Sequence, residues 1–422
     1  MPAAEQSNIR KIYALVLLTL VASVSLMDRT VMVILQESIR HEFHLSDSQI
    51  GLMNGLVFSV AYAAVTLPFG VLADRVERSR LLAVCLAFWS ATTAVCGLAG
   101  NFLQLLAARL AVGAGEAAGH PATVSMVSDL FPAKRRGTAL AVYYLSVPIG
   151  AGAALVGGGL IAGAYGWRTA FVAAAIPGFL LALLLAFTLR APPRRTAQGA
   201  TAKPPPLREV LAFVLTQRAL VQMIIAMTIS ALAAAAVGAW AASFFLRYHD
   251  MSVREVGLVL GPLNAVAGVV GMLASGLIAD RIGRRDPRRA LWLIAGAMAL
   301  HSPALVIAFT MHEQSFILAG FGLYLAIHYL SIPAALAATQ NLAGAARRST
   351  VAALVVMSTT LLGSGLGPLV TGVASDLLKP YAGAESLRWA MLGVSLLGFW
   401  SALHVLAALR TYREDLVRAE AS

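Results

Sequence analysis

Apolar residues run along this chain in long stretches, separated by short polar segments. About 20 mostly apolar residues are enough for a helix to cross the hydrocarbon core of a bilayer, so each stretch predicts one membrane span. The first stretch contains charges and lacks a small-residue cleavage site, which favours a true span over a removable signal peptide. We predict twelve spans, at residues 12–35, 49–73, 81–100, 102–130, 137–165, 169–189, 217–245, 255–279, 290–311, 314–339, 350–378 and 387–410.

The longest polar stretch runs from Arg190 to Arg208 and contains five prolines and five basic residues. This composition is typical of an extended, solvated linker. It divides the spans into six and six, so we expect an all-α membrane protein with two pseudo-symmetric six-helix bundles. The expected parts are an N-terminal bundle at 1–189, a cytoplasmic linker at 190–216, a C-terminal bundle at 217–410 and a cytoplasmic tail at 411–422.

The composition agrees with a membrane protein. Hydrophobic residues make up 59% of the 422 residues and charged residues 12%, whereas soluble domains have roughly 45–50% and about 25%. This excludes a soluble enzyme, a disordered chain and a secreted disulfide scaffold. The two cysteines, Cys85 and Cys96, are interpreted as small buried hydrophobes.

The formal net charge of +12 would indicate a nucleic-acid partner in a soluble protein. With the N-terminus inside the cell, however, 23 of the 32 basic residues fall in cytoplasmic segments and six on the opposite side. This asymmetry is the positive-inside pattern of membrane proteins. It excludes a nucleic-acid partner and predicts a multi-pass protein of the inner or plasma membrane with both termini in the cytoplasm.

A short motif occurs once in each half, which indicates an internal repeat. G-V-L-A-D-R at Gly70–Arg75 returns as G-L-I-A-D-R at Gly276–Arg281. We expect both copies in cytoplasmic loops, where glycine allows close helix contact and aspartate can brace one face shut. A polar loop that only fixes topology is the alternative. The candidate gate residues are Gly70, Asp74, Arg75, Arg78, Gly276, Asp280, Arg281 and Arg284.

Four charges lie inside predicted spans of the first half: Asp28, Arg29, Arg109 and Glu116. Ionisable groups in a bilayer are costly and therefore mark candidate functional sites. Arg109 and Glu116 are two helical turns apart, and His120 follows on the same stripe. We interpret Asp28 and Glu116 as proton-coupling groups, with Arg29, Arg109 and His120 as charge partners or substrate contacts. The alternative is a permanently paired cluster that only specifies packing.

Aromatic residues in several spans could line a cavity for an amphipathic solute, although aromatic residues at helical spacing more often pack in the core. The candidates are Tyr62, Tyr143, Tyr144, Trp240 and Phe244.

The D-R motif with its flanking basic residues resembles the major facilitator superfamily over the whole chain. The Asp28-Arg29 pair, R-L-A-V-G-A-G-E-A at Arg109–Ala117, and Y-Y-L-S-V-P-I-G-A-G at Tyr143–Gly152 resemble its Spinster-like branch. The resemblance implies alternating access by two rocking halves. It also implies transport of lysophospholipid- or sphingoid-type solutes, with Asp28, Arg29, Arg109 and Glu116 as functional charges.

Three transport functions stay open: proton-coupled movement of a lipid-like solute, proton symport of a small organic anion, and multidrug efflux. An enzyme is not expected, because the chain has no H-E-x-x-H, G-x-S-x-G or Walker motif. We expect no metal and no cofactor apart from protons as the coupling ion. The expected partners are the bilayer and a small-molecule or lipid-like substrate, and the chain is expected to be a monomer.

Overall fold

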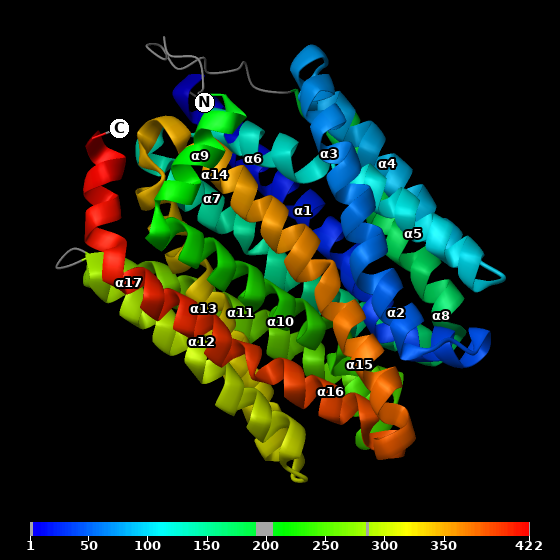
Figure 1. Ribbon diagram of the computed structural model, residues 1–422. Helices are drawn as coiled ribbons and strands as arrows, with labels where there is room; N and C mark the ends of the chain where they lie inside the picture. The colour runs from blue at the N-terminus through cyan, green and yellow to red at the C-terminus, as the bar shows by residue number, and fades with distance from the viewer. Residues whose placement is uncertain (1–2, 191–205, 284–286, 422) are drawn as a thin grey trace. The chain divides into compact units, whose positions relative to one another are not determined.

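The computed structural model describes residues 3–190, 206–283 and 287–421, and within these residues it contains helices and no strand (Figure 1). The helices before the linker are α1 (Ala3–Phe43), α2 (Asp47–Leu52), α3 (Phe58–Arg75), α4 (Arg78–Cys96), α5 (Phe102–Glu116), α6 (Gly119–Leu130), α7 (Ala133–Tyr144) and α8 (Ser146–Thr188). Those after it are α9 (Leu207–Thr216), α10 (Arg218–Tyr248), α11 (Val253–Gly283), α12 (Pro287–Thr310), α13 (Gln314–Leu342), α14 (Gly344–Ser358), α15 (Leu366–Ala382), α16 (Ser386–Ser395) and α17 (Leu397–Ala421). Two short π-helices, η1 (Met53–Val57) and η2 (Thr359–Ser364), and a 3-10 helix, η3 (Gly383–Glu385), complete the described elements.

Nine helical segments of the described residues are long and apolar enough to cross a membrane. Two of them, Arg135–Thr188 and Thr350–Ala419, are 54 and 70 residues long. A bilayer core takes about 20 helical residues, so each of these holds two spans. The twelfth predicted span is the pair α5 and α6, which a break divides into helices of 15 and 12 residues.

Local sequence explains where the long helices bend or break. Inside α8, Gly166 has φ 82° and ψ 165°, a conformation that glycine adopts without a β-carbon clash, and it separates two spans. The α5–α6 break precedes Pro121, whose ring nitrogen cannot donate to the carbonyl of Ala117. This break places Glu116 at the last position of α5 and His120 in the following helix.

Three predicted segments differ from their expected form. Gly70–Arg75 ends helix α3 and Gly276–Arg281 lies within α11, so the D-R motifs are helical and the expectation of loops is wrong. Neither motif contains proline, and the single glycine of each is accommodated within the helix. Within the predicted linker, Leu207–Thr216 forms helix α9, and Val210 in it is fully buried.

The predicted C-terminal tail is also ordered, because α17 continues to Ala421. Asp415 of this helix is fully buried and accepts a hydrogen bond of 2.7 Å from the backbone N–H of Ala219 at the start of α10. The first N–H groups of a helix lack intrahelical partners, so this carboxylate satisfies one of them.

The described residues form two compact units that interleave along the chain. The first unit comprises Met1–Ser46, Val57–Gly199 and Ala241–Ala265, and the second comprises Asp47–Leu56, Ala200–Trp240 and Val266–Ser422. Each unit therefore contains helical segments from before and after the linker.

The core of the first unit gathers around α4, where Leu82, Leu86 and Trp89 are fully buried against α1 and α6. Helix α8 crosses α1 closely at Gly150, where an added β-carbon would collide with the carbonyl oxygen of Ser23. Small residues permit this kind of close helix contact in membranes. The packing of α1 against α8, together with its contacts to α6 and α7, positions the charged residues of α1.

The core of the second unit gathers around α10, α12, α13 and α17. Leu220, Met223, Leu291 and Leu342 are fully buried in one apolar cluster with residues of α9. Helix α9 thereby attaches the end of the linker to the core of this unit.

Candidate functional site

An ion pair joins α1 to the end of α5. The Nε atom of Arg29 lies 2.7 Å from Oε2 of Glu116, and the hydroxyl of Ser25 donates to the same oxygen at 2.6 Å. Ser25 and Arg29 are four residues apart, so they project from one face of α1. The Glu116 side chain is fully buried, whereas that of Arg29 is 34% exposed. The accessible surface of the pair therefore belongs to the arginine.

The other two predicted charges are placed differently. Arg109 is 2% exposed, and its Nη1 donates to the backbone carbonyl of Asp28 at 3.0 Å. The side chain of Asp28 is fully buried, and within the described residues neither of its carboxyl oxygens has a hydrogen-bond partner. The two acids thus have unlike environments: Glu116 has a cation and a hydroxyl at one oxygen, and Asp28 has neither.

Aromatic rings cover the exposed side of Arg29. Its guanidinium carbon lies 4.5 Å from the ring centroid of Phe58 and 5.1 Å from that of Tyr62. These two rings stack with centroids 6.0 Å apart, and Arg109 lies 5.8 Å from the Phe58 ring. Cation–π contacts of this kind hold a guanidinium in place while leaving it accessible. Phe58 was missed from the sequence, because one aromatic residue in an apolar span gives no signal of its own.

A second aromatic group forms around His120. Its ring centroid is 6.2 Å from those of both Tyr143 and Tyr144, which are 5.3 Å from each other. Tyr143 is buried and its hydroxyl is hydrogen-bonded to that of Thr123 at 2.7 Å, whereas His120 is exposed. His120 can therefore contact a solute, while Tyr143 supports it.

The two aromatic candidates of α10 have another environment. Trp240 and Phe244 are both fully buried. The indole N–H of Trp240 donates to the carbonyl of Pro368 at 3.0 Å, and Phe244 packs edge-on against Phe245 at 5.7 Å. Side chains with no accessible surface pack in the core and do not line an open cavity, so neither enters the proposal below.

Of the candidate gate residues, Arg78 has a described side chain. It is 5% exposed, and its Nη1 donates to Asp129 at 2.7 Å and to Ser125 at 2.6 Å. This arginine therefore joins the start of α4 to α6. The side chains of Gly70, Asp74, Arg75, Gly276, Asp280 and Arg281, together with the whole of Arg284, lie outside the described residues.

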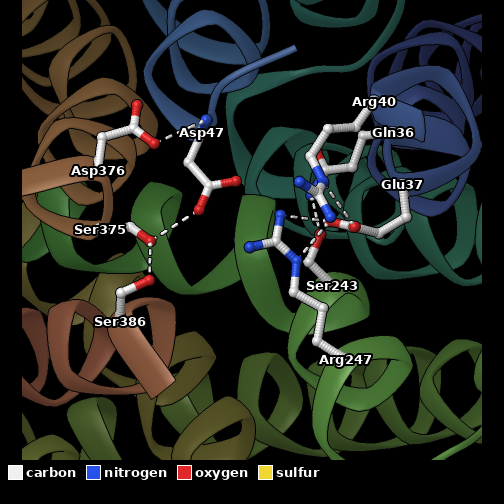
Figure 2. Close-up of polar contacts among 9 residues, drawn as sticks. All are labelled: Gln36, Glu37, Arg40, Asp47, Ser243, Arg247, Ser375, Asp376 and Ser386. Carbon is white, nitrogen blue, oxygen red and sulfur yellow. Dashed lines mark hydrogen bonds and ion pairs between the residues drawn. The ribbon is translucent and has the colours of Figure 1, made fainter. Parts of the chain in front are cut away.

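Polar contacts also connect α1 with α10 in the first unit (Figure 2). The Nη2 and Nε atoms of Arg247 lie 2.7 and 3.0 Å from Oε1 of Glu37, and Arg40 approaches the other oxygen at 3.0 Å. Beside them, the amide of Gln36 donates to the hydroxyl of Ser243 at 2.6 Å. We call Gln36, Glu37, Arg40, Ser243 and Arg247 the α1–α10 latch. It links a helix that precedes the linker to one that follows it.

A separate polar group in the second unit connects α2 with α15 (Figure 2). Asp376 accepts hydrogen bonds from the backbone N–H of Asp47 at 3.2 Å and of Ser48 at 2.8 Å. Asp47 in turn accepts from Ser375 at 2.7 Å. Asp376 thus caps the N-terminus of α2 from another helix, in the way that a carboxylate normally caps its own helix.

Glycines bring α2 and α15 into direct backbone contact. A β-carbon at Gly51 of α2 would collide with the carbonyl oxygen of Pro368 in α15, and one at Gly55 of the adjoining η1 would collide with that of Gly365, just before α15. The two glycines are four residues apart, the spacing of close-packed membrane helices. The α2–α15 contact therefore depends on both side-chain hydrogen bonds and small residues.

In the second half, His301 and His328 form a buried aromatic group with Tyr324. The two imidazole centroids are 5.6 Å apart, and the His328 ring stacks on Tyr324 at 5.8 Å. Within the described residues, Nε2 of His301 and Nδ1 of His328 have no hydrogen-bond partner. Among all the residues that the structure describes, there is no group of three or more histidine, cysteine, aspartate or glutamate residues that could bind a metal ion.

The fold and this site define a multi-pass membrane transporter. The family model of the Major Facilitator Superfamily matches residues 17–368. The chain belongs to this superfamily, and its class is therefore a transporter and not an enzyme.

Individual relatives agree with this assignment. An "MFS-type efflux pump" of Mycolicibacterium smegmatis is 31% identical over 98% of this chain and 96% of its own length. "Protein spinster homolog 1" of Xenopus tropicalis is 25% identical over 93% of this chain and 80% of its own. The crystal structure of a bacterial homologue of the human lysosomal transporter Spinster, inward-facing and unoccupied, superposes with a TM-score of 0.88 at 26% identity, covering 96% of this chain and 98% of that one. The Spinster-like resemblance and the twelve-helix fold are confirmed.

Proposed function

We propose that this transporter moves an amphipathic, lipid-like solute by alternating access and couples the movement to protons at Glu116 and Asp28. The carrying observation is the ion pair between the buried Glu116 carboxylate and the one-third exposed Arg29, next to a buried Asp28 whose carboxyl oxygens have no hydrogen-bond partner within the described residues. A paired and an unpaired acid in one buried site can exchange roles when their surroundings change.

The contacts support a specific coupling step. Arg29 belongs to α1 and Glu116 to α5, so a shift of α1 would separate the guanidinium from the carboxylate. An unpaired carboxylate in an apolar interior is costly, and binding a proton removes that cost. Proton uptake at Glu116 would therefore accompany the movement that releases Arg29. Asp28, adjacent to Arg29 on α1, is the second acid whose surroundings this movement alters.

The chemistry around Arg29 suits an amphipathic solute. Its exposed guanidinium can pair with an anionic headgroup, and the rings of Phe58 and Tyr62 offer apolar surface next to that charge. His120 and Tyr144 extend this surface in the same unit. The Spinster-named relatives and the relative named an efflux pump support a transport function for this chain, and the charge and rings around Arg29 favour an amphipathic solute.

The membrane arrangement belongs to the same proposal. The 23-to-6 distribution of basic residues supports cytoplasmic termini and a plasma-membrane location. The α1–α10 latch and the α2–α15 contact would then lie at the non-cytoplasmic ends of their helices. We propose that both contacts open when the solute site faces outward, and that the two six-helix halves, 1–189 and 217–410, move against each other in one monomer. The helix-end motifs around Asp74 and Asp280 are proposed as the gate on the cytoplasmic side.

The test is uptake into proteoliposomes driven by an imposed pH gradient, with fluorescent lysophospholipid as the solute. Glu116→Gln and Asp28→Asn should each abolish gradient-driven movement while counterflow between equal solute pools continues. Glu414→Gln removes an exposed carboxylate far along α17 and is the matched control. If both site variants retain gradient-driven transport, the coupling assignment is wrong.

Two other transport functions, symport of a small organic anion and multidrug efflux, are each supported by one observation. The exposed Arg29 guanidinium also suits a small organic anion, and the relative at 31% identity is named an efflux pump. A thermal-shift screen separates them. Stabilisation by sugar acids but not by lysolipids would favour anion symport, and raised cellular resistance to unrelated lipophilic cations would favour multidrug efflux.

A further inference from the structure

A cavity of about 640 Å³ lies between the start of α12 and the later part of α17, within the second unit. Its lining is formed by Arg288, Arg289, Trp292, Leu406, Leu409 and Arg410. None of these residues belongs to the site around Arg29 and Glu116. Its volume falls within the ~300–1,000 Å³ that small-molecule sites commonly have.

Three arginines concentrate positive charge at one end of this cavity. Arg288 donates from Nη2 to the backbone carbonyl of Leu409 at 2.7 Å, which fixes the start of α12 against α17. Arg289 and Arg410 are exposed, and no carboxylate of the described residues forms an ion pair with either of them. Asp286, close in sequence, lies outside the described residues. Two accessible guanidinium groups from two helices therefore face the same space without a described counter-ion.

The other end of the cavity is apolar and accessible. Trp292 follows Arg288 by one helical turn and is 63% exposed, and Leu406 precedes Arg410 by one turn and is 36% exposed. Leu403, about one turn before Leu406 in α17, is 63% exposed. Along both helices the lining thus changes from cationic to apolar within a turn. Tryptophan commonly occupies the interface between headgroups and hydrocarbon.

We propose that this cavity binds an anionic phospholipid of the surrounding bilayer, with the phosphate between Arg289 and Arg410 and an acyl chain against Trp292 and Leu406. A phosphodiester accepts hydrogen bonds from two guanidinium groups at once. Basic pockets between membrane helices suit anionic headgroups for this reason. A soluble anion would match the arginines but would leave the apolar end uncovered, so the two-part lining selects a lipid. The bound lipid joins α12 to α17 and acts as a fixed part of the protein, separate from the transported solute.

The experiment uses the full chain purified in detergent and depleted of lipid. Dioleoyl phosphatidylglycerol, dioleoyl phosphatidylcholine or inorganic phosphate is titrated, with bound lipid counted by native mass spectrometry and Tm measured in parallel. The double variant Arg289→Gln/Arg410→Gln should bind phosphatidylglycerol roughly 25-fold more weakly, since each basic residue near an anionic lipid changes its affinity about fivefold. Arg10→Gln/Arg135→Gln removes two exposed charges elsewhere and should bind it like the unmodified chain.

A second variant keeps every charge. Leu406→Trp fills the apolar end of the cavity and should displace the lipid while the arginines stay in place, so it is informative even if the double variant folds poorly. The proposal is overturned if phosphatidylglycerol binds Leu406→Trp and the double variant as it binds the unmodified chain. It is also overturned if phosphatidylcholine binds equally well, or if inorganic phosphate alone gives the whole Tm shift.

Discussion

Arg29 donates to Glu116 across 2.7 Å while its guanidinium lies over the rings of Phe58 and Tyr62. One side chain of α1 therefore contacts a buried carboxylate and an accessible aromatic surface at the same time. Because both contacts use one planar group, a change in the carboxylate alters how that group is presented to a solute.

Replacing Arg29 by lysine should separate these two contacts. Lysine keeps the charge, but its ammonium cannot cover two rings as a planar guanidinium does. We expect Arg29→Lys to lower solute affinity about tenfold and to leave Tm nearly unchanged. Arg29→Ala should also destabilise the protein by about 1–3 kcal/mol, because it removes the cation from a buried carboxylate. Transport assays and thermal unfolding of both variants provide the measurement, and equal affinities for Arg29→Lys and the unmodified chain would contradict the double role.

In the α1–α10 latch, we expect loss of the charge of Glu37 to have a larger effect than loss of the charge of Arg247. Glu37→Gln removes the carboxylate that both Arg40 and Arg247 contact, whereas Arg247→Gln leaves Glu37 paired with Arg40. We therefore expect Glu37→Gln to open this contact more than Arg247→Gln does, by about 1–2 kcal/mol. Exchanging the two charges should not restore the contact, because the new arginine at position 37 would adjoin Arg40.

A cysteine at position 243 can report this opening. Ser243 is fully buried in the latch, and the native Cys85 and Cys96 are buried as well, so background alkylation is low. In membrane vesicles, the alkylation rate of Ser243→Cys by an impermeant maleimide should rise most when Glu37→Gln is also present. The asymmetry is refuted if Arg247→Gln gives the faster rate.

The glycines of the α2–α15 contact supply a third prediction. Gly51→Ala and Gly55→Ala each place a methyl group against a backbone carbonyl, which should cost about 1–3 kcal/mol through overpacking. Gly238→Ala is the matched control, because a β-carbon there meets no atom within 4 Å, and alanine favours the helical conformation. Thermal unfolding should show lowered Tm for the first two variants only. Similar Tm values for all three variants would contradict the prediction that the close contact stabilises the protein.

Arg78 supplies the last prediction. It is buried and joins α4 to α6 through Asp129 and Ser125. Arg78→Gln should therefore lower the free energy of unfolding by about 1–3 kcal/mol, because Asp129 loses its cation. Arg78→Lys should recover part of that loss, since lysine keeps the charge but not the forked geometry. Chemical or thermal unfolding compares the variants with Arg80→Gln, whose side chain is 82% exposed and should have little effect.

The sequence predicted the spans and the four intramembrane charges, because a charge within a long apolar stretch is conspicuous. It could not predict how those charges pair. Arg109, seven residues from Glu116, contacts the backbone of Asp28 instead of a carboxylate, and this depends on the rotation of α1 against α5. The partners Glu37 and Arg247 are 210 residues apart and each resembles an ordinary residue at the end of a span.

The conformation of the D-R motifs was also not predictable from the sequence. The D-R motifs read as loops because glycine and charged residues are common there, yet neither motif contains proline, and the helix accommodates the single glycine of each. Phe58 and the glycines at 51 and 55 were not singled out, because their importance comes from what faces them across a helix contact and not from their own neighbours in sequence.

The cap on α2 has a consequence for how the protein is made. The first N–H groups of this helix are satisfied by Asp376, which follows more than 300 residues later in the chain. During synthesis from the N-terminus, α2 therefore lacks the two hydrogen bonds to Asp376 until α15 has been produced. Glu37 can pair with Arg40 of its own helix at once, but its contact with Arg247 forms only after α10 has been produced. The first spans can enter the membrane early, but these contacts at their ends are completed only by segments that the ribosome adds late.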